Sequence, residues 1–142
     1  MDTGEALTQA PIFRALKQGQ LKSLERTAKM RQFARGELLV REGEDAAAFF
    51  VLCEGEAEVA NGVGTVGEKV IGHLSKGDFF GEMALLDGFP RSASVRATTD
   101  CECLVLLRWD FLATVRANPE VALDILPVLS RRLRDCEGQL LP

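Results

Sequence analysis

From residue 30 onward, apolar residues come in short stretches of about five, separated by turns that contain glycine. In Glu56-Ala57-Glu58-Val59, two apolar side chains alternate with two glutamates, which is the pattern of a strand with one buried face. Short strands joined by glycine-bearing turns are typical of an all-β barrel or sandwich. The sequence therefore predicts a β-rich core region.

Helical periodicity flanks this β region on both sides. Before it, apolar residues within residues 12–29 are spaced as in short helices, with a break expected near Gly19. After it, residues 109–137 are expected to form further helices. A chain of 142 residues is the size of one ordinary domain. We therefore predict a single domain over residues 1–142, with the β region at about residues 30–108.

The C-terminal helical segment has a clear start and one weak point. Asn118-Pro119-Glu120 combines a capping residue, a first-turn proline and a first-turn acid. Pro127 removes a backbone donor and clashes with the preceding turn, so a kink or a break into two helices is expected there. One apolar stripe recurs at helical spacing and is expected to pack in the core or to form a dimer seam. It consists of Leu126, Leu129, Leu133 and Cys136.

The composition narrows the class of protein. Apolar residues make up 46% and charged residues 27%, which is typical of a globular domain. The net charge of −4 argues against a nucleic-acid binder that relies on phosphate neutralisation. No apolar run approaches the roughly 18 residues of a membrane span, and the N-terminus lacks a signal-peptide pattern. We therefore expect a cytoplasmic protein with no membrane role, whose four cysteines are free thiols.

Few residues offer catalytic or metal-binding chemistry. The only histidine, His73, falls on the polar face of its strand, and Cys101 and Cys103 are expected to be core residues. With one histidine and no evident acid–base pair of carboxylates, we expect neither a metal site nor an enzyme. The segment Asn61–Glu68 has three glycines and is interpreted as a hairpin loop. A phosphate-binding loop is disfavoured because no Lys-Ser or Lys-Thr follows it.

The stretch from Gly77 to Ala97, GDFFGEMALLDGFPRSASVRA, interrupts the strand pattern. It contains one helical turn, whose start near Gly81 presents backbone N–H groups to an anion. By strand parity Arg91 points inward, and a buried guanidinium needs an anionic partner. Glu82 is one candidate for that partner. The other is a ligand phosphate, with Glu82 accepting from a ligand hydroxyl, and the spacing alone leaves both open.

The segment FGEMALLDGFPRSASV resembles the phosphate-binding cassette of the cyclic nucleotide-binding domain family, and the resemblance runs from about Phe13 to Leu133. It is strongest to the regulatory domains of bacterial catabolite activators, through KGDFFGE, the Arg-Ser-Ala triplet and VRATTDCE. The resemblance implies a mainly β fold with flanking helices, a double-stranded β-helix or jelly roll. The helix-turn-helix domain that follows in those activators is not expected here, and neither is DNA binding.

Carried over residue by residue, the resemblance implies a ligand site on the same segment. Glu82 would accept from the ribose 2'-hydroxyl, and Arg91 would pair with the cyclic phosphate. Ser92 and the amide of Ala93 would hydrogen-bond the same phosphate.

The resemblance also implies contacts to the sugar and the base. Gly81 and Met83 would line the ribose pocket through backbone groups. The helix positions that contact the base by hydroxyl side chains in the activators correspond here to Cys136 and Glu137. The implied ligand is 3',5'-cyclic AMP, with cyclic GMP as the alternative, and no cofactor is expected.

Three functions remain open at this point. The first is a cyclic nucleotide-sensing regulatory module that relays ligand binding through its C-terminal helix, with a homodimer through that helix or a protein effector as partner. The second is a structural or protein-interaction domain whose pocket no longer binds cyclic nucleotide. The third is a sensor for another ligand, such as haem or a different nucleotide.

Overall fold

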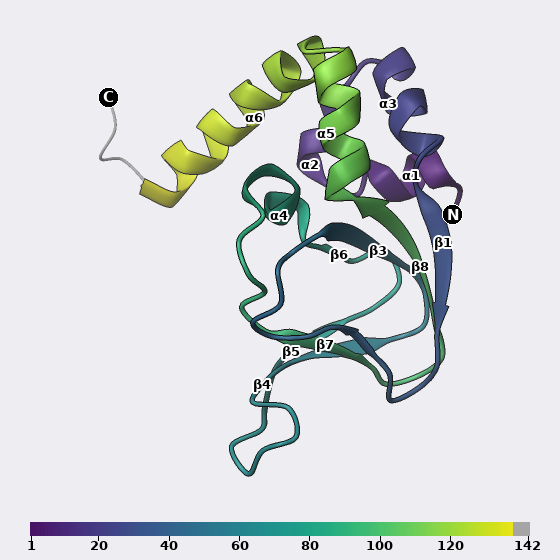
Figure 1. Ribbon diagram of the computed structural model, residues 1–142, viewed down its shortest axis with the longest axis vertical. Helices are drawn as coiled ribbons and strands as arrows, with labels where there is room; N and C mark the ends of the chain where they lie inside the picture. Colours follow the sequence, from purple (N-terminus) through teal and green to yellow (C-terminus); the bar gives the residue numbers. More distant parts are fainter. Residues whose placement is uncertain (138–142) are drawn as a thin grey trace.

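The computed structural model describes residues 1–137 and contains two antiparallel β-sheets with helices packed against one of them (Figure 1). The strands are β1 (Lys29–Phe33), β2 (Leu38–Val40), β3 (Ala48–Glu54), β4 (Ala57–Asn61), β5 (Lys69–Leu74), β6 (Phe79–Phe80), β7 (Ser94–Ala97) and β8 (Cys101–Leu107). The helices are α1 (Thr3–Leu7), α2 (Pro11–Arg14), α3 (Gln18–Glu25), α4 (Glu82–Asp87), α5 (Arg108–Ala117) and α6 (Glu120–Glu137).

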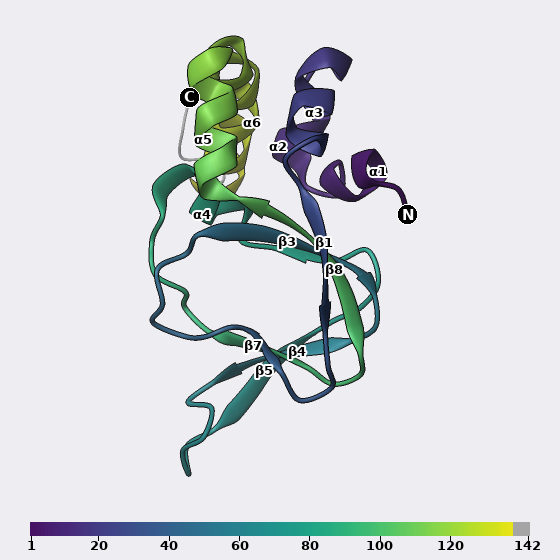
Figure 2. The same ribbon diagram turned by 45° about the vertical axis from the view of Figure 1, so that its right-hand side comes forward.

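The two sheets face each other and enclose the interior of a β-barrel-like roll. One sheet has the strand order β1-β8-β3-β6, and the other has the order β2-β7-β4-β5. Helices α1, α2, α3, α5 and α6 lie on the outer side of the first sheet in both views (Figures 1 and 2). The predicted mainly β fold with flanking helices is confirmed.

Strand β3 is buried on both faces, which explains its continuous apolar sequence. Phe49 and Val51 belong to the core cluster between the sheet and the helices, whereas Phe50 and Leu52 belong to the cluster between the two sheets. This is the alternation expected of successive residues in a strand. Phe13 of α2 packs edge-on against Phe49, with 5.3 Å between the ring centroids. The helices are therefore fixed directly to the central strand of the roll.

The N-terminal helices differ from the sequence prediction. Gly19 lies inside α3, and the break falls earlier, between α2 and α3. A glycine costs about 1 kcal/mol inside a helix, whereas burial of Leu24, which is fully inaccessible, contributes roughly 2 kcal/mol. Packing of α3 thus outweighs the glycine. A further helix, α1, precedes the predicted region, and the Asp2 side chain caps it by accepting from the Glu5 N–H at 2.8 Å.

A kink or a break was predicted at Pro127, and of these two the break is wrong, because helix α6 is continuous. The proline leaves the carbonyl of Leu123 without its helical N–H partner. Both residues lie on the exposed side of α6, where the carbonyl is open to solvent that can supply the missing donor.

The buried face of α6 differs from the predicted stripe. The buried residues of this helix are Val121, Ile125 and Val128. Leu129 is partly buried against the same core, but Leu126 and Leu133 are each 56% exposed and Cys136 is exposed. The helix carries two adjacent apolar faces, and contacts with α2 and α5 select the first of them. The role of the second face as a dimer seam stays a prediction.

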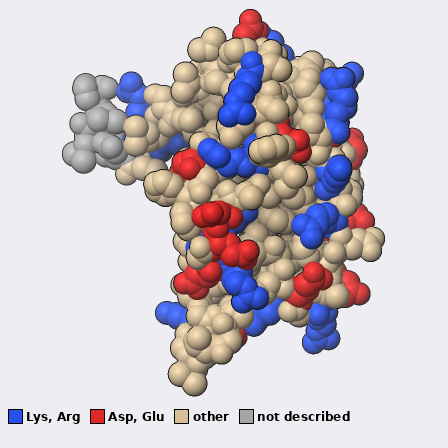
Figure 3. Space-filling model, in the orientation of Figure 1, with Lys and Arg blue, Asp and Glu red and all other residues tan. Residues whose placement is uncertain are grey.

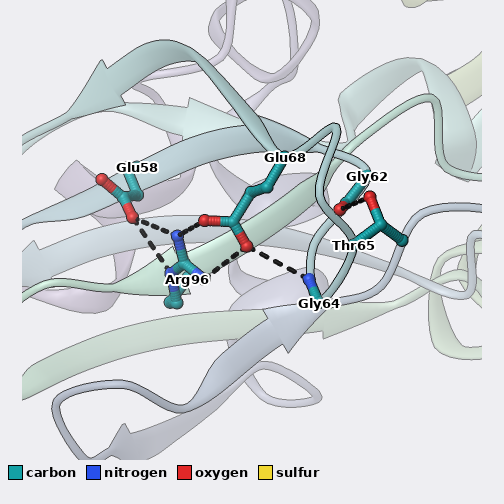
Figure 4. A network of polar contacts seen from close by, with 6 residues as sticks. All are labelled: Glu58, Gly62, Gly64, Thr65, Glu68 and Arg96. Atoms are coloured by element: carbon teal, nitrogen blue, oxygen red, sulfur yellow. Dashed lines mark hydrogen bonds and ion pairs between the residues drawn. The ribbon is translucent and has the colours of Figure 1, made fainter.

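Residues 62–68 form the predicted hairpin loop between β4 and β5, and the hairpin projects from the roll on the side away from the helices (Figure 1). Arg96 ties this loop to the sheet (Figure 4). Its Nη2 donates to Glu58 Oε1 at 2.6 Å and to Glu68 Oε2 at 3.0 Å. Glu68 Oε1 accepts in turn from the Gly64 N–H at 3.1 Å. A glycine-rich loop is thereby held by side chains at its base.

The surface shown in Figure 3 carries basic and acidic side chains in alternation, without one large patch of a single sign. Across residues 1–137, every helix is too short or too polar to cross a membrane.

All four cysteines, which lie within the described residues, are free thiols as predicted. Cys53, Cys101 and Cys103 are buried and Cys136 is exposed. Burial raises the pKa of the Cys103 thiol to about 12, so this thiol stays neutral at physiological pH.

Candidate functional site

The segment that follows β6 forms one short helix, α4, as predicted, and a glycine bounds it at each end. Gly81 has φ of +85° and Gly88 has φ of +68°, both in the left-handed region that glycine adopts most readily. Beyond the helix, the Asp87 side chain accepts from the Phe89 N–H at 3.0 Å and stabilises the turn back toward β7. The chain thus places a helix between two strands of the roll.

A cavity of about 290 Å³ lies between this segment and the strands of the second sheet. Strands β2, β4 and β7 contribute valine side chains to its walls. Five of the predicted site residues line it: Gly81, Met83, Arg91, Ser92 and Ala93. The cavity is therefore apolar on the side of the sheet, and its polar side chains come from the segment.

Arg91 turns inward, as strand parity predicted. Its Nη2 donates to the Ala48 carbonyl oxygen at 2.6 Å. Its Cζ lies 5.7 Å from the centroid of the Phe50 ring and 6.0 Å from that of Phe80, and these two rings stack at 4.8 Å. Among residues 1–137, Arg91 forms no salt bridge with a carboxylate. A half-buried cation thus faces the cavity without a carboxylate within ion-pair distance among the described residues.

The electrostatics of Arg91 favour an anionic ligand. Burial lowers the pKa of its guanidinium, and the charge of Glu44 partly offsets this by raising it. Glu44 and Arg91 both line a neighbouring cavity of about 220 Å³. Because a guanidinium stays protonated in proteins, attraction to an anion in the cavity would compensate the part of its desolvation that the Ala48 carbonyl and the two rings leave.

Gly81 allows the guanidinium of Arg91 to lie directly against the start of α4. A Cβ atom at this position would lie 2.6 Å from Arg91 Nη1 and 2.7 Å from the Ala48 carbonyl oxygen. Both distances are shorter than any normal carbon contact. Only glycine fits between the guanidinium and the central strand.

Glu82 does not pair with Arg91, so the first of the two partners considered from the sequence is wrong. Its Oε1 pairs with Nη1 of Arg132 at 2.6 Å, and its side chain is only 6% exposed. Its Oε2 is buried and has no hydrogen-bond partner among the described residues. Arg132 belongs to α6, which passes over α4 (Figures 1 and 2). The site thus joins the segment 81–93 to the C-terminal helix.

Comparison with known proteins assigns the same fold and family. The family model described as the cyclic nucleotide-binding domain matches residues 30–118, from β1 through α5. The chain belongs to the cyclic nucleotide-binding domain family.

Two curated relatives illustrate the range of proteins that carry this domain. The chain is 40% identical over 91 residues to a cAMP-dependent protein kinase regulatory subunit of Mycosarcoma maydis, a match that covers 64% of this chain and 17% of the relative. It is 31% identical over 131 residues to the cyclic AMP receptor protein of Thermus thermophilus, covering 92% of this chain and 61% of the relative. The chain therefore spans less than two thirds of the length of these relatives.

A solved structure matches the cyclic nucleotide-binding domain over almost its full length. The N-terminal domain of a transcriptional regulator from Streptomyces coelicolor superposes with a TM-score of 0.83 at 28% sequence identity. The match covers 96% of each chain. The arrangement of the roll and its helices is thus shared with that domain.

Two predicted site residues of this cyclic nucleotide-binding domain, Glu82 and Cys136, do not line the cavity, and the side chain of a third, Glu137, lies outside the described residues. Glu82 is buried and held by Arg132, although its neighbours in α4 line the wall. Cys136 is exposed near the end of α6. Glu137 is the last residue of α6, and its side chain lies outside the described residues.

Sequence reasoning missed Arg132 as a member of the site. The signal was present in the spacing, because Arg132 follows the buried residues Val121, Ile125 and Val128 at helical intervals. The sequence prediction placed the neighbouring leucine stripe on the buried face of this helix. On that assignment Arg132 lies on the outer side, away from the site.

Proposed function

We propose that this cyclic nucleotide-binding domain is a sensing module that takes a 3',5'-cyclic nucleotide in the cavity beside α4 and has no catalytic activity. The observation that carries the proposal is Arg91, a half-buried guanidinium at the cavity wall with no carboxylate partner among the described residues. A cyclic phosphate supplies the missing negative charge, and a charge-assisted bidentate pair suits the planar guanidinium.

The remaining contacts follow the roles that the family resemblance implies. Ser92 and the Ala93 amide hydrogen-bond the phosphate beside Arg91, and all three residues line one cavity. Gly81 and Met83 approach the ribose through their backbone groups, and Glu82 accepts from the 2'-hydroxyl.

Cyclic AMP is the proposed ligand, with cyclic GMP as the alternative. Two of the most similar relatives carry cyclic AMP in their names. In addition, Ser92 follows Arg91 where members that prefer guanine often have threonine. The base would lie against the end of α6, toward Cys136 and Glu137.

The proposed output is a change in α6. This helix contacts the ligand-binding segment through Arg132, and it exposes Leu126 and Leu133 to a partner. If α6 can take two positions on the domain, a ligand that binds more tightly to one of them raises the population of that position. The size of the shift is set by the difference between the ligand's affinities for the two positions. The partner is either a second copy, through this helix, or a protein effector in the cytoplasm.

Calorimetric titration with cyclic AMP and cyclic GMP, side by side, tests the proposal. Arg91→Ala should weaken binding by at least about thirtyfold, since truncating one member of a shielded charge pair costs roughly 2 to 5 kcal/mol. Arg91→Lys keeps the charge but loses the planar fork, and should recover part of the affinity.

Arg96→Ala is the matched control, because Arg96 pairs with Glu58 and Glu68 and does not line the cavity. It should leave the affinity within about twofold. Equal binding by wild type and Arg91→Ala would refute the phosphate assignment. A wild-type protein that binds neither nucleotide would instead favour a structural or protein-interaction domain.

A further inference from the structure

We infer that Glu44 competes with the ligand phosphate for Arg91 and thereby lowers the affinity of the site for cyclic nucleotide. The inference rests on the proposed function and deepens it, because it names a residue outside the ligand cavity that sets how tightly the phosphate is held.

Arg91 lies in the wall between two cavities. It lines the cavity of about 290 Å³ that the nucleotide is proposed to enter, and it also lines the neighbouring cavity of about 220 Å³. The two stacked rings beside its guanidinium are divided in the same way, since Phe80 lines the first cavity and Phe50 lines the second. Glu44 lines the second cavity only. A phosphate can therefore reach Arg91 from one cavity while the charge of Glu44 acts on it from the other.

Backbone hydrogen bonds hold Glu44 beside Arg91. The Arg91 N–H donates to the Glu44 carbonyl oxygen at 2.8 Å, and the Gly43 N–H donates to the Arg91 carbonyl oxygen at 2.9 Å. The next residue back in this loop is held as well, because the Glu42 N–H donates to Ser94 Oγ at 2.9 Å. The loop between β2 and β3 is thus attached to the ligand-binding segment, and Glu44 cannot withdraw from Arg91 without breaking these bonds.

Glu44 acts on Arg91 through its charge and does not orient it. Across the described part of the chain, the two side chains form no salt bridge. The guanidinium is oriented instead by the Ala48 carbonyl oxygen and by the two stacked rings. Burial lowers the pKa of the Arg91 guanidinium, and the negative charge of Glu44 raises it. Removal of that charge should therefore leave Arg91 in place while changing the electrostatic potential at its guanidinium.

Glu44 has opposite effects on the free protein and on the complex. Without ligand, its charge attracts the partly desolvated guanidinium and stabilises the folded chain. A phosphate bound to Arg91 supplies the same attraction at closer range. The bound phosphate and the Glu44 carboxylate then repel each other, because the backbone keeps the carboxylate nearby. Stabilisation of the free protein and repulsion in the complex both lower the affinity.

Calorimetry and urea denaturation together test this inference. Cyclic AMP is titrated into wild type, Glu44→Gln, Arg91→Ala and the double variant Glu44→Gln/Arg91→Ala, and unfolding of each is followed without ligand. Glu44→Gln removes the charge and keeps the size of the side chain. Asp45→Asn is the matched control, because Asp45 is adjacent, exposed and lines the same cavity, but it makes neither backbone bond to Arg91.

Glu44→Gln should bind cyclic AMP about two- to fivefold more tightly than wild type, the range expected for one exposed charge. The same variant should have a lower free energy of unfolding without ligand. A merely structural role of Glu44 would instead lower both stability and affinity. The gain in affinity should shrink at about 1 M salt, where the screening length is about 3 Å. It should also be smaller in the Arg91→Ala background, where there is no guanidinium to compete for. Asp45→Asn should change neither quantity.

Three results overturn the inference while the proposed function stands. The first is an affinity of Glu44→Gln equal to or below that of wild type. The second is an equal gain in Asp45→Asn, which assigns the effect to the net charge of the surface. The third is an equal gain with and without Arg91, which shows that Glu44 does not act through the guanidinium. A wild-type protein that binds neither nucleotide refutes the proposed function itself, and the inference with it.

Discussion

Replacement of Gly81 by alanine tests how closely the guanidinium of Arg91 is packed. The residue has φ of +85°, a conformation that costs an alanine about 1 to 2 kcal/mol. In addition, the new Cβ would lie 2.6 Å from Arg91 Nη1 and 2.7 Å from the Ala48 carbonyl oxygen. The side chain of Arg91 can move away, which breaks its 2.6 Å hydrogen bond to Ala48, whereas the clash with the Ala48 carbonyl oxygen requires the backbone to shift as well. The lost hydrogen bond leaves a buried acceptor unsatisfied, at a cost of roughly 1 to 3 kcal/mol.

Gly36 provides a matched control for the backbone cost. Its φ is +87°, and a Cβ there would meet nothing within 4 Å. Gly36→Ala should therefore lower the free energy of unfolding by about 1 to 2 kcal/mol, which is the conformational cost alone. Gly81→Ala should lower it by at least about a further 1 to 3 kcal/mol, because the lost buried hydrogen bond adds to the cost of shifting the backbone away from Ala48.

Urea denaturation of both variants and of wild type measures this difference, and calorimetry with cyclic AMP measures its consequence for binding. Because Arg91 is displaced only in Gly81→Ala, only that variant should bind cyclic AMP more weakly. Equal losses of stability in the two variants, together with wild-type affinity in Gly81→Ala, would contradict the close packing of Arg91 on the start of α4.

Two further predictions concern the buried thiol and the response of α6. Burial raises the pKa of Cys103 from its ordinary value of 9.0 to about 12, so the folded protein retains a proton that the unfolded chain loses. The free energy of unfolding should therefore be unaffected by this group below pH 9 and should fall as the pH rises from 9 to about 12. Urea titrations across this range should show a shallower fall in Cys103→Ala, and identical slopes would refute the assignment. Hydrogen exchange should show that cyclic nucleotide protects amides in residues 128–137 as well as 81–93. Protection confined to residues 81–93 would argue against a relay through α6.

Local patterns in the sequence were enough to predict the β region and to single out the segment that bears the proposed ligand site. Alternation in strands such as β4, glycine-bearing turns and the strong start signal at Asn118-Pro119 depend on neighbouring residues only, so they are readable from the chain. The inward direction of Arg91 also followed from strand parity, because a period of two fixes the side on which each residue lies. The resemblance of residues 80–95 to a known cassette added the chemistry of the ligand.

The helix breaks predicted near Gly19 and at Pro127 were misplaced, and the surroundings of each residue in the folded protein give the reason. Gly19 and Pro127 both disfavour helix, yet both lie inside helices. In α3 the buried Leu24 contributes more than the glycine costs, and in α6 the proline lies on the side open to water. The free-energy cost of one poor helix-forming residue can be smaller than the free energy gained when other side chains of the same helix are buried.

The sequence by itself singled out the residues of the segment 81–93 that are proposed to bind an anion, since their identities and local conformation are set within a few positions of one another. Only the tertiary structure decided the partner of Glu82 and the buried face of α6. Helix α6 has two apolar faces, one of which contains Val121, Ile125 and Val128. Contacts with α2 and α5 determine that this face is the buried one. That choice brings Arg132 to Glu82, so that Glu82 pairs with Arg132 and not with Arg91. A pairing between residues far apart in the chain depends on how helices pack on the sheet, and no local pattern contains that information.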